Sequence, residues 1–309
     1  MSTLRVALND YLALRRSLGY KLERTGQVLT DFVDYAESTG TEHIQTDIAL
    51  SFALLASNPD SQWRAARLGM VRSFARYLHA IDPSHEVPPT GLIPRGRGRP
   101  APYLYSQDEV TALMSASRRL RSPLQAATLE AVIGLLAVSG LRVGEVIRLN
   151  NDDVDFCDAI LTVRFSKGGK SRVVPIQEST VEALQVYLIV RDQWFPEARS
   201  ESFFVSRAGQ SLRSSSLGAA FARVSSLAGL PTRTGHNGPR LGDFRHSFAV
   251  QTLLRWHMDE IEVAPRLPTL STYLGHVNPT STYWYFSASP ELLAAAVQRL
   301  TRYMEVDER

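Results

Sequence analysis

The chain has 309 residues, of which 44% are hydrophobic and 21% are charged. At a soft prior of about 150 residues per domain, this length predicts roughly two domains. The composition is that of globular proteins rather than of disordered tails. The 34 basic and 31 acidic residues give a net charge of +3, which argues against a histone-like polycation. The single cysteine, Cys157, excludes an internal disulfide and any cysteine-based zinc site.

No apolar run approaches the roughly 18 residues that a membrane span requires. The first 20 residues mix charged and apolar side chains from the start, which is not the pattern of a signal peptide. From these two observations we expect a soluble, cytoplasmic protein without a membrane partner.

The basic residues are strongly biased towards arginine. Only three of them are lysines, Lys21, Lys167 and Lys170, and the other 31 are arginines. Genomic codon bias is one explanation of this inventory. The other is a surface selected for phosphate, which the planar guanidinium binds through two parallel hydrogen bonds.

Residues 1 to about 80 show apolar side chains at helical spacing. Four helices are predicted there, near 4–18, over 26–37, over 47–55 and over 63–78. The fourth helix carries a row of arginines opposite its apolar face: Arg64, Arg67, Arg72 and Arg76. This row is either a solvated face or a helix that lies along a DNA backbone, and the pattern favours neither.

The stretch from Asp82 to Tyr105 contains six prolines, which exclude a continuous helix. It is typical of an extended interdomain linker. Arg95, Arg97 and Arg99 alternate with glycines there, so that the backbone can follow a phosphate chain closely, and we favour nucleic-acid contact over a plain solvated linker. The expected parts are an N-terminal helical domain, a Pro/Arg/Gly-rich linker and a second domain: 1–90, 91–104 and 105–309.

The second domain is predicted to combine helices with a small β-hairpin. It opens with a Ser-x-x-Glu capping box at 106–109. An amphipathic helix with Pro290 in its first turn is predicted over 290–304. The elements between them are a buried helix over 124–139, strands over 159–165 and 173–176 joined by a hairpin tip at 166–171, a helix over 181–194 and a short strand over 203–205.

Four motifs in the second domain carry the residues suited to chemistry on a phosphodiester. They are GLRVGE at 140–145, Lys167 at the hairpin tip with Lys170 and Arg172 after it, DFRHSFA at 243–249, and LGH at 274–276 followed nine residues later by Tyr285. Their order and spacing resemble the tyrosine recombinases, also called phage integrases. That family shows G-L-R-x-x-E, a hairpin lysine, H-x-x-R-H-x-F-A, L-G-H and then a tyrosine nine residues on. Each fragment alone is weak, whereas the ordered set is a strong match.

The resemblance covers the chain from about Tyr105 to its end and, more loosely, the first domain. It implies a mainly α fold with a small β-sheet, in which an N-terminal helical (SAM-like) core-binding domain and a mixed α/β catalytic domain form a C-shaped clamp around DNA. It also implies that the helix over 290–304 docks into a neighbouring subunit of a homo-tetramer on DNA, from a monomer or dimer when free. Partner recombinases and accessory proteins stay open.

The activity implied by the resemblance is site-specific recombination of double-stranded DNA at specific sites. Strands are cleaved and rejoined through a covalent 3′-phosphotyrosine and a Holliday junction, as in integration, excision or transposition of a mobile element. No metal and no cofactor are expected. Two alternatives stay open: a catalytically impaired DNA-binding member of the family, and an enzyme like a type IB topoisomerase, against which the short helical first domain and the docking tail argue.

Attack on a phosphodiester builds negative charge on its non-bridging oxygens, which two guanidiniums can stabilise. Arg142 and Arg245 match the two phosphate-clamping arginines of the family. The alternative for Arg142 is a surface ion pair with Glu145, one helical turn away. In the favoured interpretation, Glu145 orients the site and does not react.

Tyr285 matches the nucleophile, with Tyr283 as the rival. A phenol has a pKa near 10 and attacks only when it is deprotonated or hydrogen-bonded. Lys167 matches the general acid that protonates the leaving 5′-oxygen, a role for which arginine is unsuited because its pKa exceeds 12; Lys170 is the rival. His276 matches the histidine that donates to the scissile phosphate, and a helix-capping histidine is the alternative. The remaining expected DNA-binding residues are Arg64, Arg67, Arg95, Arg97, Arg99, Lys170 and Arg172.

Gly242 departs from the family pattern, because the family usually carries a histidine three positions before the second arginine. Glycine has no side chain to accept the proton of the tyrosine, and a positioned general base contributes about 10²–10⁴-fold. Three explanations stay open: a deliberate substitution, a natural protein that uses water or His246 instead, or impaired catalysis. His236, in a Gly-rich loop six residues upstream, is a weaker candidate for the missing group.

Overall fold

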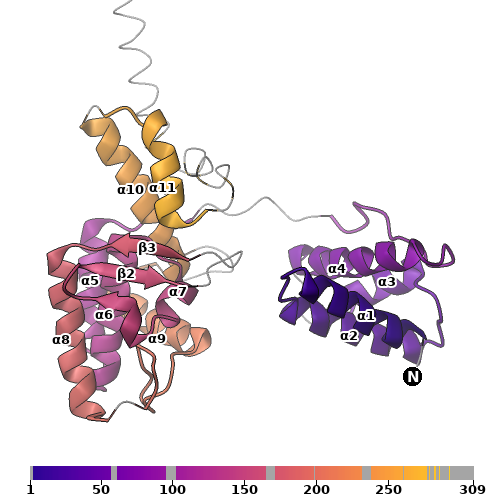
Figure 1. Cartoon of the computed structure of the whole chain (residues 1–309), viewed down its shortest axis with the longest axis horizontal. Helices are drawn as coiled ribbons and strands as arrows, with labels where there is room; N and C mark the ends of the chain where they lie inside the picture. The colour runs from indigo at the N-terminus through magenta and orange to yellow at the C-terminus, as the bar shows by residue number, and fades with distance from the viewer. Residues whose placement is uncertain are drawn as a thin grey trace, which may run out of the picture. The chain divides into compact units, whose positions relative to one another are not determined.

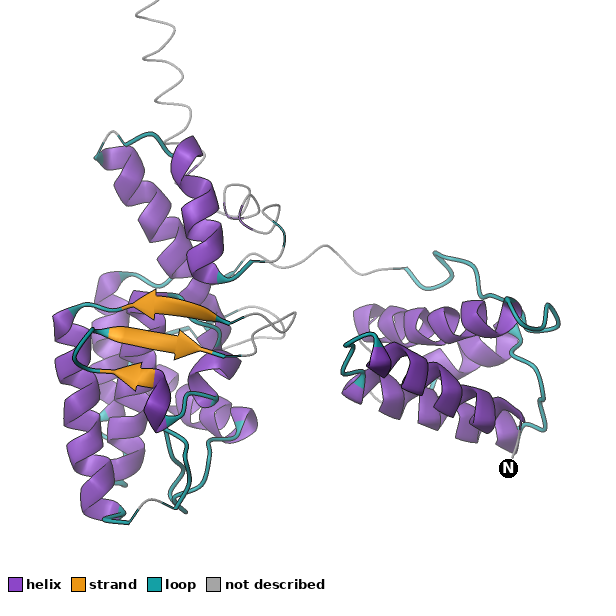
Figure 2. Ribbon diagram, in the orientation of Figure 1, coloured by secondary structure: helices purple, strands orange, loops and turns teal. Residues whose placement is uncertain are grey.

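The computed structural model describes most of the chain in two compact units, Met1–Arg99 and Pro100–Arg309. The described residues are 3–56, 61–94, 102–164, 171–197, 199–231, 238–259 and 261–276, with Asn278, Thr282, Tyr285 and Leu292. Their architecture is mainly helical with one three-stranded sheet, which confirms the fold class that the sequence implied (Figures 1 and 2). None of the described helices has the length and apolarity needed to cross a membrane.

The N-terminal unit consists of four helices close to the predicted positions. They are α1 (Thr3–Ser17), α2 (Glu23–Ser38), α3 (Thr46–Leu54) and α4 (Ser61–His79). Their apolar faces meet in one core, in which Leu29, Phe32 and Phe74 are fully buried. The helical periodicity predicted these helices because most of the residues that carried it are buried or half-buried, although Leu18 is 65% exposed.

The described part of the Pro-rich segment after α4 contains no helix, as predicted, and residues 80–94 of it pack against the N-terminal unit. The backbone amide of Glu86 donates to the carbonyl of Ile44 over 2.7 Å. Arg72 donates to the carbonyls of Pro88 and Pro89, over 2.6 and 2.7 Å, and Ile93 lies in the core of the unit. Within the predicted linker, residues 95–101, with Arg95, Arg97 and Arg99, fall outside the described residues.

The C-terminal unit is built around α6, which is apolar on all sides and packs against α5, α8 and α10. Its antiparallel sheet has the order β1-β2-β3, with Leu161 opposite Val174. Figure 2 shows the sheet lying against one side of the helices. The elements are α5 (Gln107–Ser117), α6 (Pro123–Ser139), α7 (Val143–Ile147), η1 (Asn151–Asp153), β1 (Val154–Asp155), β2 (Ile160–Val163), β3 (Arg172–Pro175), α8 (Glu178–Trp194), α9 (Ser214–Leu227), η2 (Leu241–Asp243), α10 (Phe244–Met258), η3 (Ala264–Arg266) and α11 (Leu267–Leu274).

One local prediction for this unit is confirmed and another is wrong. The capping box at the start of α5 is present, because Ser106 Oγ accepts from the amide of Glu109 and the Glu109 carboxylate accepts from the amide of Ser106. The strand predicted over 203–205 is wrong: Phe203 and Phe204 are buried in a loop with only single bridges near them, at Ser202 and Val205. Residues 166–170 of the predicted hairpin tip at 166–171 and, apart from Leu292, the helix over 290–304 lie outside the described residues.

Candidate active site

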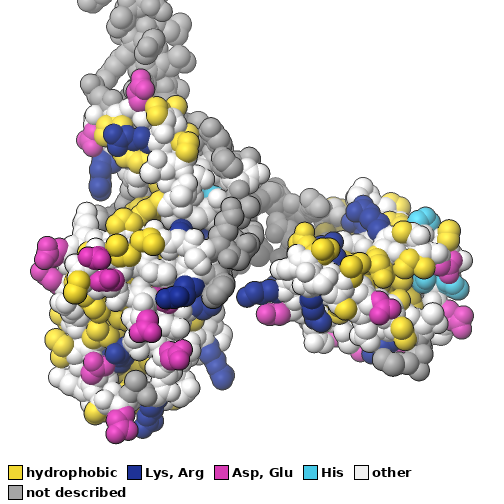
Figure 3. Space-filling view, viewed as in Figure 1, with side chains coloured by type: hydrophobic (Ala, Val, Ile, Leu, Met, Phe, Trp, Pro, Cys, Tyr) yellow, Lys and Arg dark blue, Asp and Glu magenta, His cyan; other side chains and the backbone are white. Residues whose placement is uncertain are grey.

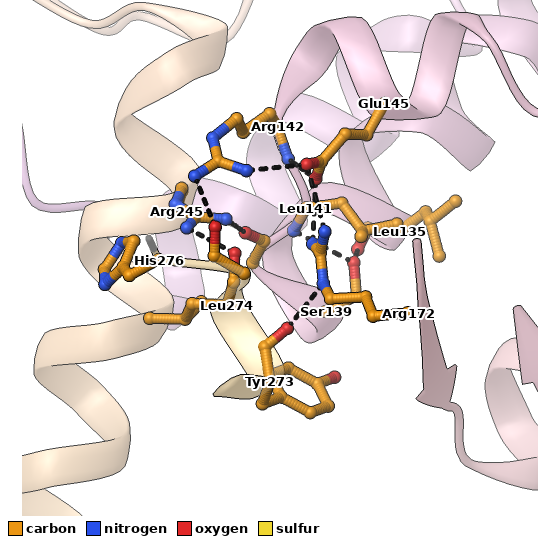
Figure 4. A network of polar contacts seen from close by, with 12 residues as sticks. Leu135, Ser139, Leu141, Arg142, Glu145, Arg172, Arg245, Tyr273, Leu274 and His276 are labelled. Atoms are coloured by element: carbon orange, nitrogen blue, oxygen red, sulfur yellow. Dashed lines mark hydrogen bonds and ion pairs between the residues drawn. The ribbon is translucent and has the colours of Figure 1, made fainter. Parts of the chain in front are cut away.

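One place in the C-terminal unit brings together the described residues Arg142, Glu145, Arg172, Arg245 and His276 of the four motifs, although up to 134 positions of the chain separate them (Figure 4). The turn after α6 prepares this meeting. Gly140 ends α6 with a positive φ of 59°, and a Cβ there would lie 2.5 Å from the ring of Phe248. Glycine is therefore required at this position, where the chain leaves α6 and places Arg142 at the start of α7.

Arg245 lies in the first turn of α10, and only 7% of it is exposed. Its guanidinium donates to the carbonyl of Gly140 over 2.9 Å and to the carbonyl of Leu274 over 2.6 Å. Burial lowers the pKa of Arg245 to about 10, and the neighbouring Tyr285 acts in the opposite direction. At neutral pH the site thus contains a cation that is fixed in place by two helix ends.

Arg142 pairs with Glu145, as the alternative interpretation of this arginine anticipated. Its Nη1 donates to the Glu145 carboxylate over 2.7 Å, and its backbone amide donates to the same carboxylate over 2.9 Å. Its Nη2 also donates to the carbonyl of Gly275 over 3.0 Å, and 29% of the side chain stays exposed. Because the Glu145 side chain is 1% exposed, this is an interior contact that orients a half-open guanidinium, not a surface ion pair.

Glu145 also binds Arg172, whose guanidinium donates to both carboxylate oxygens, over 2.9 and 3.1 Å. Burial would raise the pKa of Glu145, but the hydrogen bonds from Arg172 and from the Arg142 backbone outweigh it and lower the pKa to about 2. Glu145 is therefore a permanent anion between two cations. The role expected for it, orienting the site without reacting, stays a prediction.

Arg172 had been expected on the DNA-facing surface, and the structure places it inside this network instead. Besides Glu145, its guanidinium contacts the carbonyl of Tyr273 over 2.8 Å, and 10% of the side chain is exposed. Gly275, at φ 68°, leaves room for it, since a Cβ there would lie 2.7 Å from Arg172 Nη1. No pattern in the sequence indicates this contact, because it depends on how closely β3 approaches the end of α11.

Tyr285 and His276 lie side by side. The hydroxyl of Tyr285 is 3.5 Å from Nε2 of His276, and the two rings stack with centroids 5.9 Å apart. The edge of the His246 ring also contacts Tyr285, at a centroid distance of 5.4 Å. Tyr285 is 2% exposed, so the expected nucleophile is held inside the site of its own chain.

The other ring nitrogen of His276 is 2.7 Å from the hydroxyl of Thr282, a contact that sequence reasoning missed. Thr282 precedes Tyr285 by three positions, the spacing of neighbours on one helical face, which was the available signal. Burial, followed by the charges of Arg245 and Arg142, lowers the pKa of His276 to about 4. His276 is therefore neutral at physiological pH.

Comparison with known proteins agrees with this geometry. The phage integrase family model matches residues 104–291, which is more than half of the chain. The chain belongs to the phage integrase family of tyrosine recombinases. A protein of Sinorhizobium fredii named integrase/recombinase y4rB is 44% identical over 311 aligned residues, and the alignment covers 99% of both chains.

Two solved structures share the fold of this family member. The XerH site-specific recombinase bound to its palindromic difH substrate, in a post-cleavage complex, matches with a TM-score of 0.62 at 18% identity, over 92% of this chain and 79% of that one. A lambda integrase tetramer bound to a Holliday junction matches with a TM-score of 0.59 at 17% identity, over 91% and 76%. At such identities these likenesses establish the fold alone.

Gly242, the departure from the family pattern, lies in η2 and is not required by packing. A Cβ at this position would meet no heavy atom within 4 Å. The glycine borders a cavity of about 490 Å³, whose lining includes Val143, Phe221 and Arg240. A larger side chain fits here, so the missing histidine of the family does not reflect a lack of space.

The expected DNA-binding residues are placed only in part. The guanidinium of Arg67 lies over the ring of Phe52 at 4.0 Å, and burial lowers its pKa. Nε of Arg64 is buried without a hydrogen-bond partner among the described residues. Figure 3 shows basic and acidic side chains interspersed on the visible faces of both units. Lys167 and Lys170 lie outside the described residues.

Within the described part of the chain, no cluster of His, Cys, Asp or Glu side chains is suited to binding a metal ion.

Proposed function

We propose that this chain is a site-specific DNA recombinase that cleaves and rejoins strands through a tyrosine. The observation that carries the proposal is the convergence of Tyr285, His276 and Arg245 with Arg142, which precedes Arg245 by 103 positions of the chain. The Tyr285 oxygen attacks the phosphorus, a 3′-phosphotyrosine forms, and the strand with the 5′-hydroxyl leaves. Because the new ester keeps the bond energy, a 5′-hydroxyl can later reverse the reaction without ATP, metal or cofactor.

Arg142 and Arg245 bind the non-bridging oxygens of the scissile phosphate in this scheme. The half-open guanidinium of Arg142 suits a ligand that enters from solvent, while the two main-chain bonds of Arg245 fix its orientation before DNA arrives. Such preorganised donors stabilise the charge that develops in the transition state. Lys167 supplies the proton to the leaving oxygen, and His276 donates to the phosphate in the family's usual arrangement.

The assembly that we propose is the one expected from the family. The N-terminal domain, 1–90, and the catalytic domain, 105–309, enclose double-stranded DNA at a specific site, with Arg64, Arg67, Arg95, Arg97, Arg99 and Lys170 on phosphates. Four copies, linked by the helix over 290–304, exchange strands through a Holliday junction. The solved lambda integrase tetramer on a Holliday junction supports this proposal by analogy. Integration, excision or transposition of a mobile element is the process that such chemistry serves.

Trapping the covalent intermediate tests this function. The target sequence is first selected from random duplexes with the Tyr285→Phe variant, and a nicked suicide duplex is then built on it. We expect an adduct with the wild-type chain that denaturing electrophoresis retains and protease removes, and none with Tyr285→Phe. Equal adduct levels for both chains would refute Tyr285 as the nucleophile.

The second candidate function is a DNA-binding member of the family without catalysis, which the side-chain-free position at Gly242 favours. Specific binding of the selected duplex without any wild-type adduct would establish it. Relaxation of supercoiled DNA by a monomer, without exchange between two sites, would instead indicate an enzyme of the topoisomerase type.

A further inference from the structure

We propose that His276 is the general base that accepts the proton of Tyr285, and that Thr282 is the positioning residue that holds His276 in the required tautomer. The inference rests on the proposed function and gives His276 a proton-accepting role that precedes its phosphate contact. Neutral His276 has one N–H, so Nε2 can donate to the phosphate only after it has taken up the proton of Tyr285. It also answers the question that Gly242 raises, because the position where the family usually carries a histidine has no side chain here.

The two ring nitrogens of His276 have different neighbours, which suit one to donate a proton and the other to accept one. Nδ1 of His276 is 2.7 Å from Thr282 Oγ1, and Nε2 is 3.5 Å from the Tyr285 hydroxyl. When Nδ1 carries the proton and donates it to Thr282, Nε2 is left as an acceptor that faces the phenol. Thr282 and Tyr285 are both 2% exposed, so water does not compete freely for these contacts. Hydrogen bonds of catalytic groups are often long before substrate binds, which the 3.5 Å separation fits.

The surrounding charges make the base responsive to substrate. Arg245 on α10, Arg142 on α7 and Arg172 on β3 all disfavour a proton on His276, and Glu145 favours it less strongly. In the free protein His276 is a neutral but weak acceptor. A phosphodiester bound to Arg142 and Arg245 brings a negative charge that offsets these cations. Its arrival therefore raises the proton affinity of His276 at the moment when the base is needed.

The proton balance of the step is complete. The Tyr285 O–H proton passes to Nε2 of His276 while the phenolic oxygen forms its bond to phosphorus. The bond from phosphorus to the 5′-oxygen breaks, and that oxygen takes a proton from the proposed acid, Lys167. In the reverse step, imidazolium returns the proton to the departing tyrosine. Arg245, whose charge is favoured by Tyr285, stabilises the phenolate character that develops between these events.

His246 is the competing base, because its ring also contacts Tyr285. It meets the phenol ring edge-on at 63°, whereas His276 stacks at 27° with a nitrogen at the hydroxyl. The stacked arrangement directs an acceptor at the reacting oxygen. We therefore assign the role of general base to His276, and the variant His246→Gln tests the competing assignment.

The test is single-turnover cleavage of the nicked suicide duplex by the wild-type chain and by His276→Gln, from about pH 6 to about pH 10. Glutamine keeps an N–H donor for the phosphate but cannot take up a proton. We expect His276→Gln to cleave about 10²–10⁴-fold more slowly near neutral pH, the usual contribution of a general base. The deficit should shrink by about tenfold per pH unit, because phenol ionises without help as the pH approaches 10. A deficit that is the same at every pH means that His276 only binds phosphate, and overturns the inference.

Thr282 is tested by the pair Thr282→Val and Thr282→Ser. Valine removes the acceptor for Nδ1 and should slow cleavage with the same pH-dependent recovery, while serine should restore the wild-type profile. Identical profiles for the wild-type chain and Thr282→Val would overturn the role of Thr282. Thermal unfolding and duplex binding are measured for each variant, and free imidazole added to His276→Ala gives a second readout that should restore cleavage.

The outcomes separate this inference from the proposed function. A wild-type chain that forms no adduct overturns the recombinase proposal. A wild-type chain that forms adducts, together with a pH-dependent loss in His246→Gln and none in His276→Gln, overturns only the assignment of the base.

Discussion

The carboxylate of Glu145 and the guanidinium of Arg172 form a two-bond ion pair, with contacts of 2.9 and 3.1 Å across 27 positions of the chain. The pair joins α7, which carries Arg142 on its N-terminal side, to the first residue of β3. Since β3 follows the segment that contains Lys167, the pair connects Arg142, the proposed phosphate-binding residue, with the strand that leads from the expected acid.

Arg172→Met is expected to destabilise the protein by about 3 kcal/mol. This is the lower end of the range for removing one partner of a buried pair, because Arg142 still binds Glu145. Denaturant unfolding measures the effect. The matched control is Arg118→Met, which breaks an ion pair with Glu130 whose arginine side chain is 69% exposed, and should cost less than about 1 kcal/mol. Equal losses of unfolding free energy in both variants would show that burial does not increase the contribution of the Glu145–Arg172 pair to stability.

Glu145 makes stability depend on acid pH. Its pKa is lowered from 4.5 to about 2 in the folded chain, so the folded state binds its proton less readily than the unfolded state. The resulting stabilisation is fully present above about pH 4.5 and is lost as the pH falls towards 2. We expect the slope of unfolding free energy against pH in this window to be smaller in Glu145→Gln. An unchanged slope would assign the acid sensitivity to other carboxylates.

Lys167→Arg should keep DNA binding and lose most cleavage, because arginine holds its proton too tightly to donate it. A duplex with sulfur at the scissile 5′-bridging position separates this defect from others, since a thiolate leaves without a proton donor. We expect that duplex to restore cleavage by Lys167→Arg. Lys170→Arg is the matched control; if it, and not Lys167→Arg, required the sulfur substrate, the acid would be Lys170.

Gly242→His should fold normally, because a Cβ at this position meets no atom within 4 Å. If His276 already acts as the base, the added histidine has little to contribute, and we expect the cleavage rate to change by less than about tenfold. Single-turnover kinetics on the suicide duplex measure this rate. A gain within the 10²–10⁴-fold range of a general base would instead identify Gly242 as the defect that limits the natural chain.

Much of the fold could be predicted from the sequence. The helices α1 to α4 are close to their predicted bounds, because the apolar spacing that marks them is largely that of their buried faces, and α6 was marked by its continuous apolar run. Strand β1 was missed, since its two residues are too few for a pattern. A strand was wrongly predicted over 203–205, because the buried aromatic residues of this loop are of the types common in strands.

The candidate site, like the fold, could be predicted only in part from the sequence. Arg142, Arg245, His276 and Tyr285 were identified by ordered spacing, and the structure brings them together. The contacts of Arg172 with Tyr273 and of Thr282 with His276 were not foreseen. They depend on how β3, α11 and the segment after α11 approach one another, and no local pattern in the sequence encodes those distances.

Arg245 is bonded to the carbonyl groups at the ends of two helices, Gly140 after α6 and Leu274 in the last turn of α11. The guanidinium of Arg245, which would bind the substrate, thus also joins the C-terminal ends of two helices and complements their partial negative charges. Loss of activity after replacement of Arg245 would therefore mix a chemical defect with a loosened scaffold. An inactive chain for trapping DNA complexes is better built at Tyr285, where the change to phenylalanine removes a single oxygen atom.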